Sequence, residues 1–405
     1  MKILALNCGS SSIKYLLYDW ELKKNIVKGM VERIGTNSSS ISCTTDTIHI
    51  TKELPIEDYQ YALQLILDLF TSHAIISAVA HRVVHGGEYF SKSVLIDDEV
   101  INAVKELSVL APLHNPPNLE GIKAAKRILP DIPHVAIFDT AFHQTMPKSA
   151  YMYAVPIEWY AKHKIRRYGF HGTSHLYLSK RAAKMLKKPA SECNLITLHM
   201  GNGVSVTAIK NGMSVDTSMG LTPLEGVVMG SRAGDIDPSI PLHMQNIIGL
   251  TPDEMYMFLN RKSGVYGICG YLDMRDVMAA ANRGDELCEL AIEIKSYRLR
   301  QYIGKYLVTL GRLDAIVFTA GVGENSPLMR RRVLEGLENF GIIMDRKKNE
   351  ATFSGTGETD LSAENSIVRI LMIPTNEEQV LIEDTVGVLN GNYSDHMSYG
   401  YTFGG

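Results

Sequence analysis

The chain has 405 residues, of which 45% are hydrophobic and 21% charged, and its formal net charge is −3. This composition is ordinary for a globular protein, and the length exceeds what one compact core usually holds, so two domains are expected. The small net charge excludes a generally basic surface for nucleic acid, and no apolar stretch is long enough to span a membrane. The five scattered cysteines include no CxxC pair, which favours reduced thiols in the cytoplasm over a disulfide framework or a zinc site.

The N-terminus predicts a hairpin with an unusual tip. The stretch "LNCGSSSIKY" follows a short apolar run, so we expect a strand at Lys2–Leu6, a polar tip at Asn7–Ser12 and a second strand at Ile13–Tyr18. A third strand is expected after the next turn. The apolar run Ile3–Leu6 is too short for the core of an export signal, and no small-residue cleavage site follows it.

Helical and strand patterns alternate along the rest of the chain. Spacing of apolar residues predicts helices at Glu57–Thr71, Ser174–Lys187, Asp285–Leu310 and Pro327–Phe340, and a last helix that begins near Asn376 after a strand and a turn at Pro374. Segments 35–46 and 390–405 are expected to be loops. Alternating strands and helices indicate the α/β class.

A second hairpin near the middle of the chain has the pattern of the first. The stretch "NLITLHMGNGVSVTAIKNGMSVD" predicts a strand at Leu195–His199, a glycine tip at Gly201–Gly203 and a strand at Val204–Ile209, followed by a turn at 210–212. Two such hairpins half a chain apart suggest duplicated domains that each offer a loop to a shared cleft. Coincidence between two unrelated hairpins is the alternative.

Three loops carry the small residues that suit phosphate binding. In the first tip, hydroxyl groups can donate hydrogen bonds, glycine lets backbone N–H groups approach, and Lys14 supplies charge, although the spacing is not that of a P-loop. A plain serine-rich turn remains the alternative. The glycine tip "HMGNGVS" suits the same task, and "IVFTAGVGENSP" reads as a strand, a glycine loop and a helix start. Together the three loops favour a nucleotide site.

Charged residues near these loops suit phosphoryl transfer. Transfer of a phosphoryl group needs cations around its oxygens and carboxylates for a metal ion. Candidates are Arg82, Asp139, His171, Arg232 and Glu377. Each also has a plain structural interpretation, such as a surface arginine, a loop histidine or a carboxylate at a helix start.

The motifs together resemble the acetokinase family. The resemblance rests on "NCGSSSIK", "HRVVHGG", "APLHNPPN", "FDTAFHQTMP", "YGFHGTSH", "TSMGLTPLEG", "GDIDP", "FTAGVGEN" and "IPTNEE", in this order over nearly the whole chain. It implies an α/β fold of duplicated actin-like (ribonuclease H-like) domains with ATP in the cleft between them. The expected division is 1–140 with about 376–390, 141–375, and a tail at 391–405.

The resemblance also implies a reaction and its participants. The reaction is reversible Mg²⁺-dependent phosphoryl transfer between ATP and acetate, which gives acetyl phosphate and ADP. Mn²⁺ is an alternative to Mg²⁺, and a homodimer without nucleic-acid or membrane partners is expected. A short-chain acyl kinase such as a propionate kinase is the nearest alternative reaction, and a non-catalytic ATP-dependent switch is an alternative of another class.

Site residues follow from the resemblance by position. Asp139, His171 and Arg232 would be catalytic, Arg82 and Val84 would contact the carboxylate substrate, and Asn7 and Glu377 would position the metal ion. The nucleotide and its phosphates would contact Ser10, Ser12, Lys14, His199, Met200, Gly201, Asn202, Gly203, Asp273, Met274, Arg275, Gly321, Val322, Gly323, Glu324 and Asn325.

Two further features concern specificity. Val84 lies two residues after Arg82 on an expected strand, so both side chains point to the same side, and valine favours acetate over longer acids. The residues before Asp273 are Tyr271 and Leu272, where the family usually has small polar residues. The small pair Gly321-Val322 leaves room for adenosine, which argues against a pyrophosphate-dependent variant.

Overall fold

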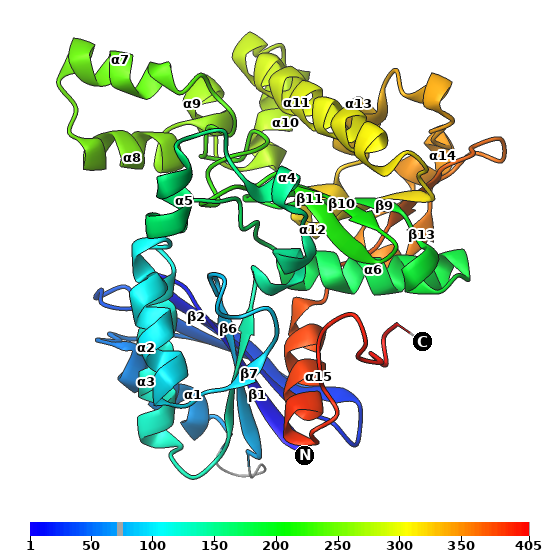
Figure 1. Cartoon of the computed structure of the whole chain (residues 1–405). Coiled ribbons are helices and arrows are strands. Elements are labelled where there is room, and N and C mark those ends of the chain that lie inside the picture. Colours follow the sequence, from blue (N-terminus) through cyan, green and yellow to red (C-terminus); the bar gives the residue numbers. More distant parts are fainter. Residues whose placement is uncertain (71–75, 405) are drawn as a thin grey trace. The chain divides into compact units, whose positions relative to one another are not determined.

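The computed structural model describes residues 1–70 and 76–404 (Figure 1). The chain forms two compact units, which are treated separately below. The first comprises Met1–Gln144 and Asn376–Thr402, and the second comprises Thr145–Thr375 and Phe403–Gly405. No helix in the described ranges is both long and apolar enough to cross a membrane.

The first unit is built on a mixed sheet with strand order β5-β4-β3-β2-β1-β6-β8-β7. The strands are β1 (Lys2–Cys8), β2 (Ser12–Asp19), β3 (Lys24–Glu32), β4 (Ser40–Thr44), β5 (His49–Glu53), β6 (Ala78–Val83), β7 (Val94–Leu95) and β8 (His134–Phe138). The helices are α1 (Tyr59–Asp68), α2 (Asp98–Glu106), α3 (Asn115–Ile128) and α15 (Glu377–Leu389). Strands β1 to β3 pair antiparallel, whereas β6 and β8 run parallel to β1.

Helices cover both faces of this sheet. Along β1, Leu4 and Leu6 join one core with residues of α1 and α3, while Ile3 and Ala5 join another with residues of α15. This division follows from the alternation of side chains along a strand. Because both faces are buried, β1 is a nearly continuous apolar run.

The second unit has its own mixed sheet, with order β11-β10-β9-β12-β14-β13. The strands are β9 (Leu195–Met200), β10 (Val204–Lys210), β11 (Met213–Thr217), β12 (Ala315–Thr319), β13 (Thr359–Asp360) and β14 (Arg369–Met372). The helices are α4 (Lys148–Tyr151), α5 (Ile157–His163), α6 (Gly172–Leu186), α7 (Ser239–Ile248), α8 (Pro252–Arg261), α9 (Gly264–Cys269), α10 (Met274–Asn282), α11 (Glu286–Leu310), α12 (Ala320–Asn325), α13 (Pro327–Leu334) and α14 (Arg346–Glu350). Helix α6 packs on β9 and β12, and α11 packs on β10 (Figure 1).

The two sheets share one topology. The strands β3-β2-β1-β6-β8 of the first sheet correspond to β11-β10-β9-β12-β14 of the second. In each set the first three strands pair antiparallel, and the last two run parallel to the third strand, which is β1 in the first sheet and β9 in the second. The prediction of a duplicated α/β fold is therefore confirmed. The correspondence matches the tip after β1 with the tip after β9, and the carboxyl ends of β6 and β8 with those of β12 and β14.

Several predicted elements need correction. Segment 35–46 was expected to be a loop, but residues 40–44 form β4, because Ile41 and Cys43 alternate with polar residues and are buried. The helix expected to reach Phe340 ends at Leu334, and Gly336 beyond it has a φ of +82° that a helix cannot contain. The helix predicted at Glu57–Thr71 is α1, which runs from Tyr59 to Asp68, and Thr71 lies outside the described residues.

The C-terminal tail packs back on α15. Buried Asp384 of this helix accepts hydrogen bonds from Ser93 Oγ at 2.6 Å, from Tyr401 OH at 2.6 Å and from Tyr393 OH at 3.3 Å. Burial raises the pKa of Asp384 to about 7. The tyrosines of the tail thus fasten residues 390–402 to the helix that begins with Glu377.

Candidate active site

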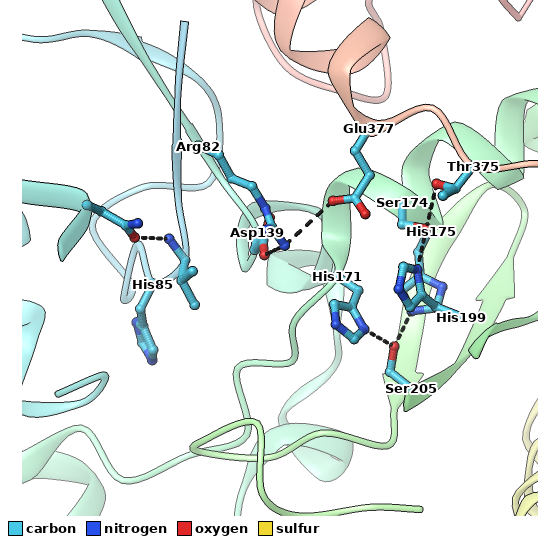
Figure 2. Close-up of polar contacts among 12 residues, drawn as sticks. Arg82, His85, Asp139, His171, Ser174, His175, His199, Ser205, Thr375 and Glu377 are labelled. Atoms are coloured by element: carbon cyan, nitrogen blue, oxygen red, sulfur yellow. Dashed lines mark hydrogen bonds and ion pairs between the residues drawn. The ribbon is translucent and has the colours of Figure 1, made fainter. Parts of the chain in front are cut away.

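In the first unit, Arg82 lies against two carboxylates (Figure 2). Its Nε donates to Asp139 Oδ1 at 2.9 Å and its Nη2 to Asp139 Oδ2 at 2.5 Å, while Glu377 Oε2 lies 3.5 Å from Nη2. Arg82 and Asp139 sit at the carboxyl ends of the neighbouring parallel strands β6 and β8, and Glu377 is the first residue of α15. Burial disfavours the charge of Arg82, but Asp139 and Glu377 outweigh it and raise the pKa of the guanidinium.

The backbone of Val84 is held by Asn118, the second asparagine of "APLHNPPN". Its N–H donates to Asn118 Oδ1 at 2.9 Å, and the amide of Asn118 donates to the carbonyl of Cys8 at 2.6 Å. Asn118 on α3 therefore ties the end of β6 to the end of β1. Arg82 and Val84 are both partly exposed while Val83 between them is fully buried. Strand β6 ends at Val83, so Val84 lies just beyond the strand on which it was expected.

The serine-rich tip is partly open to solvent. Ser10 and Lys14 are exposed, and Ser12 begins β2. Lys14 pairs across the hairpin with Asn7, and both line a cavity of about 420 Å³ whose wall includes Asn376 and Glu378. Asn7 thus faces a cavity beside the start of α15, whereas Glu377 is held against Arg82.

In the second unit, His171 belongs to a network of histidines and hydroxyls (Figure 2). Its Nδ1 lies 2.8 Å from Ser205 Oγ, which lies 2.8 Å from His175 Nε2, and the other nitrogen of His175 contacts Thr197 Oγ1 at 2.7 Å. The His171 ring stacks on His199, with centroids 4.1 Å apart. The network fixes the orientation of the imidazole of His171.

Around His199 a second set of contacts holds the glycine tip. His199 Nδ1 lies 2.8 Å from Ser174 Oγ, which lies 3.2 Å from Thr375 Oγ1. These contacts link the end of β9 to α6 and to the segment after β14.

Arg232 carries a charge without a carboxylate partner in the described part of the chain. Its Nη1 donates to the carbonyl of Pro223 at 3.2 Å. Burial, together with the nearby Arg261, lowers the pKa of Arg232. A β-carbon on Gly203 would lie 3.5 Å from His171 Nε2 and 3.6 Å from Arg232 Nη1, so the imidazole and the guanidinium both border this glycine. The arrangement is that of a binding site for an anion.

Half of the predicted nucleotide residues, eight of sixteen, line one cavity of about 560 Å³. Its wall contains Gly201, Asn202, Gly230, Leu272, Asp273, Met274, Arg275, Met278, Lys295, Gly321, Val322, Asn325 and Ser326. The three segments predicted to hold phosphates and adenosine therefore line a single space. Asp273 also caps α10 and pairs with Arg275, with Arg275 Nη2 2.6 Å from Asp273 Oδ2.

Eight predicted nucleotide residues do not belong to this wall: Ser10, Ser12, Lys14, His199, Met200, Gly203, Gly323 and Glu324. Met200 is fully buried in β9, and Gly323 lies in the short helix α12 where a loop was expected. Glu324 is turned inward, and its Oε1 accepts from the N–H groups of Ala320 at 2.8 Å and Thr375 at 3.0 Å. The carboxylate of Glu324 thus stabilises the start of α12 in the α/β fold.

Lys295 is a residue of the cavity wall that the sequence reasoning missed. It is 0% exposed, and its Nζ has no hydrogen-bond partner among the residues that the structure describes. Burial lowers its pKa to about 8 from an ordinary 10.5. The sequence pattern could have shown that Lys295 is buried, because it falls on the apolar stripe of α11 formed by Ala291, Ile292 and Leu299.

We expect Lys295→Met to stabilise the protein, and more so at neutral than at alkaline pH. The folded protein binds the lysine proton less tightly than the unfolded chain, so the buried charge destabilises it below about pH 8 and the penalty fades between pH 8 and 10.5. The full penalty is on the order of 3 kcal/mol. Denaturant unfolding at pH 7 and pH 10 measures it, with Lys305→Met, on an exposed part of the same helix, as control. An equal gain at both pH values would contradict this account.

Metal binding by protein side chains alone is not supported. Among residues 1–70 and 76–404, no three His, Cys, Asp or Glu side chains are grouped to hold a metal ion. Mg²⁺ usually keeps several waters and takes one or two protein ligands beside substrate phosphates. Asn7 and Glu377 carry oxygen atoms of the type that such a site uses.

The quoted motifs also contain residues of the site to which the sequence analysis assigned no role. Asn118 of "APLHNPPN" positions Val84, and Ser205 in the glycine hairpin positions His171. His175 of "YGFHGTSH" acts on His171 through Ser205. His175 could have been found from its place one helical turn after His171.

Comparisons with known proteins agree with the resemblance. Residues 2–383 match the model of the acetokinase family. The chain is 55% identical to the acetate kinase of Geobacter sulfurreducens over 413 aligned positions, covering 100% of this chain and 98% of the relative, and 53% identical to that of Thermotoga maritima, covering 95% and 98%.

Solved structures give the same result. The acetate kinase of Porphyromonas gingivalis superposes with a TM-score of 0.91 at 41% identity, covering 96% of this chain and 99% of the other. A propionate kinase from Francisella tularensis superposes with a TM-score of 0.90 at 44% identity, covering 95% and 98%. Motifs, topology and full-length similarity lead to one conclusion: the chain belongs to the acetokinase family.

Proposed function

We propose that the protein catalyses reversible phosphoryl transfer between ATP and acetate, giving acetyl phosphate and ADP. The observation that carries the proposal is Arg232, a charge without a counter-ion that borders Gly203 together with His171. Such a cation suits an anionic group brought by the substrate. Membership of the acetokinase family and the similarity to acetate kinases support the choice of reaction.

The reaction needs no general base. A carboxylic acid is ionised at neutral pH, so a carboxylate oxygen of acetate attacks the γ-phosphorus directly. As that bond forms, the bond from phosphorus to the bridging oxygen breaks, and ADP leaves with the electron pair. No proton has to move, and the main difficulty is repulsion between two anions, which cations and fixed donors reduce.

The roles of the first unit follow from this chemistry. Arg82 binds the carboxylate of acetate or the phosphate of acetyl phosphate. Asp139 acts as a positioning residue, because its two oxygens fix the plane of the guanidinium. Ser10, Ser12 and Lys14 donate to phosphate oxygens.

In the second unit, His171 and Arg232 stabilise the transferring phosphoryl group. His199 and the tip Gly201–Gly203 hold the phosphates, and the cavity of about 560 Å³ accepts the nucleoside. Asn7 and Glu377 hold Mg²⁺, directly or through water, and Mn²⁺ is an alternative. The ion supplies positive charge to the phosphates.

The carboxylate pocket is proposed to be small because of Val84. We expect Val84→Ala to lower the KM for propionate more than the KM for acetate, since the lost methyl groups leave room for one more methylene. One methylene is worth about 1–3 kcal/mol in such a pocket. Steady-state kinetics with both acids tests this, with Val109→Ala, at an 84% exposed position, as control. Equal changes for both acids would put the pocket wall elsewhere.

A propionate kinase is the second candidate. It is favoured by the similarity to the Francisella tularensis propionate kinase, which is as high as that to acetate kinases of known structure. The modest energy of one methylene means that both acids react and that the ratio of kcat/KM values decides the assignment.

We also infer a cytoplasmic homodimer without nucleic-acid or membrane partners. The free cysteines and the small net charge support this inference. Helix α7 supports a protein contact, because it exposes Ile240, Leu242, Ile247 and Ile248 and buries none of its residues. Light scattering of the purified chain tests the dimer, and a monomeric mass would reject it.

The central experiment measures acyl phosphate formed from Mg·ATP with acetate, propionate or butyrate, trapped by hydroxylamine. The highest kcat/KM for acetate supports the proposal. Preference for propionate or butyrate would keep the phosphoryl-transfer chemistry and reject the acetate assignment. No product with any acid would favour a non-catalytic ATP-dependent switch.

A further inference from the structure

The motif "GDIDP" closes the loop that carries Arg232. At the base of this loop, residues 226–235, the N–H of Asp235 donates to the carbonyl of Gly226 at 2.7 Å, and the N–H of Gly226 donates to Asp235 Oδ1 at 2.8 Å. A β-carbon on Gly234 would lie 2.5 Å from the same carbonyl oxygen, so the two ends of the loop are in close contact. Asp235 therefore joins both ends of the Arg232 loop, through its backbone and through its side chain.

The second carboxylate oxygen of Asp235 ties the loop to helix α11. Tyr302 OH donates to Asp235 Oδ2 at 2.6 Å. Hydrogen bonds to a carboxylate are stronger than those between neutral groups. Because α11 packs on β10, this bond connects the base of the Arg232 loop to the sheet of the second unit.

The base of the loop determines where the guanidinium of Arg232 lies. Arg232 Nη1 donates to the carbonyl of Pro223 at 3.2 Å. Pro223 is three residues before Gly226, and Arg232 is three residues before Asp235. The bond thus joins a residue just before the loop to one within it, and its length depends on how the two chain segments meet at the base.

Contacts at the far end of the loop hold its backbone. The N–H groups of Val265 and Tyr266, in α9, donate to carbonyls of the loop at 3.0 and 2.8 Å. Asp235 is exposed, so its replacement leaves the core intact. We therefore expect the loop to stay folded without the carboxylate of Asp235, while the guanidinium of Arg232 loses its alignment.

We propose that Asp235 is a positioning residue for phosphoryl transfer, which holds the guanidinium of Arg232 in place through the base of the loop and uses Tyr302 as its anchor. The inference rests on the proposed function, because Arg232 acts in the same reaction. Displacement of a group at the site by about 1 Å can lower a rate about 10²-fold, even when the mutated residue lies far from the chemistry.

The test measures kcat and, by calorimetry, the affinity for ADP. We expect Asp235→Ala to lower kcat by about 10²-fold and to leave the affinity for ADP nearly unchanged. Tyr302→Phe removes only the anchor and should lower kcat by a smaller factor. The matched control is Asp237→Ala in the same motif, because Asp237 Oδ1 accepts from the N–H of Ser239 at the start of α7, at 2.8 Å. Its kcat should equal that of the wild type.

A double-mutant cycle with Arg232→Ala separates positioning from stability. If Asp235 acts through Arg232, Asp235→Ala lowers kcat in the wild type and has no further effect on kcat in Arg232→Ala. The change in unfolding midpoint should be the same in both backgrounds. An equal loss of kcat in both backgrounds, or no loss in either Asp235→Ala or Tyr302→Phe, would overturn the proposal. If Asp235→Ala does not fold, Tyr302→Phe takes its place in the cycle.

A crystal structure of Asp235→Ala gives a test that does not depend on turnover. We expect the bond from Arg232 Nη1 to the carbonyl of Pro223 to be lost, and an unchanged guanidinium would refute the positioning role. Absence of acyl phosphate with the wild type would reject the proposed reaction, and the structure of the variant would still decide whether Asp235 positions Arg232.

Discussion

Replacing Arg232 by alanine is expected to lower kcat by about 10³-fold or more while the affinity for ADP changes little. The guanidinium has no carboxylate partner among the described residues, and burial lowers its pKa. Both observations mean that the charge of Arg232 is not neutralised within the protein, so an anionic ligand can pair with it. A phosphoryl group that spreads charge over its oxygens at the transition state gains most from such a cation. An arginine supplied to phosphoryl transfer is worth roughly 10³–10⁵ in rate.

Kinetics and binding together test the role of Arg232. Arg261→Ala is the matched control, because it removes an exposed arginine close to the same site. Added guanidinium should restore part of the activity of Arg232→Ala and none of any loss in the control. A kcat near that of the wild type would remove Arg232 from the transition state, and a loss of ADP affinity equal to the loss in rate would assign it to ground-state binding.

The second large effect is expected for Asp139→Asn. This change keeps the shape of the side chain but leaves the guanidinium of Arg82 without its two-point partner, and the Glu377 carboxylate at 3.5 Å replaces it only in part. Loss of one member of a buried ion pair destabilises a protein by about 3–5 kcal/mol. We expect a lower unfolding midpoint and a fall of roughly 100-fold or more in kcat/KM for acetate.

The pH profile separates positioning from proton abstraction. If Asp139 only orients Arg82, kcat of the wild type and of Asp139→Asn should both be independent of pH between 6 and 8, and Asp139→Glu should recover part of the activity. Asp131→Asn, at an exposed position before β8, is the control. A pH-dependent step in the wild type that disappears in Asp139→Asn would instead identify a general base.

Local patterns predicted the two glycine-containing hairpins and five of the helices, and the errors have identifiable physical causes. The hairpins β1–β2 and β9–β10 combine short apolar runs with glycine-containing turns, so their bounds were predicted within two residues. Strand β4 was missed because its hydroxyl-rich composition resembles a loop, although pairing with β3 and β5 determines its structure. Composition alone cannot report such pairing between distant segments.

The candidate site was predicted less completely than the α/β fold. Motifs indicate residue types, but they do not tell which atoms of a side chain face the cavity. Glu324 and Met200 were therefore grouped with the nucleotide residues, although one binds backbone N–H groups and the other is fully buried. Lys295 lies on a helix whose pattern indicates only burial, and its unpaired charge becomes visible once α10 and α11 are packed together.

Two helices that border the nucleotide site begin with strained backbone. His171, before α6, has a φ of +58°, and Ala320, the first residue of α12, has a φ of +63°. Left-handed conformations are unfavourable for residues with a β-carbon, least so for asparagine, aspartate and histidine. Substitution of His171 is therefore restricted by the contacts of its imidazole and also by its left-handed backbone. Asparagine and glycine are the replacements that preserve the local backbone geometry. At position 320, glycine would relieve the backbone strain. Replacing Ala320 by glycine is therefore a change by which directed evolution could raise the stability of the protein.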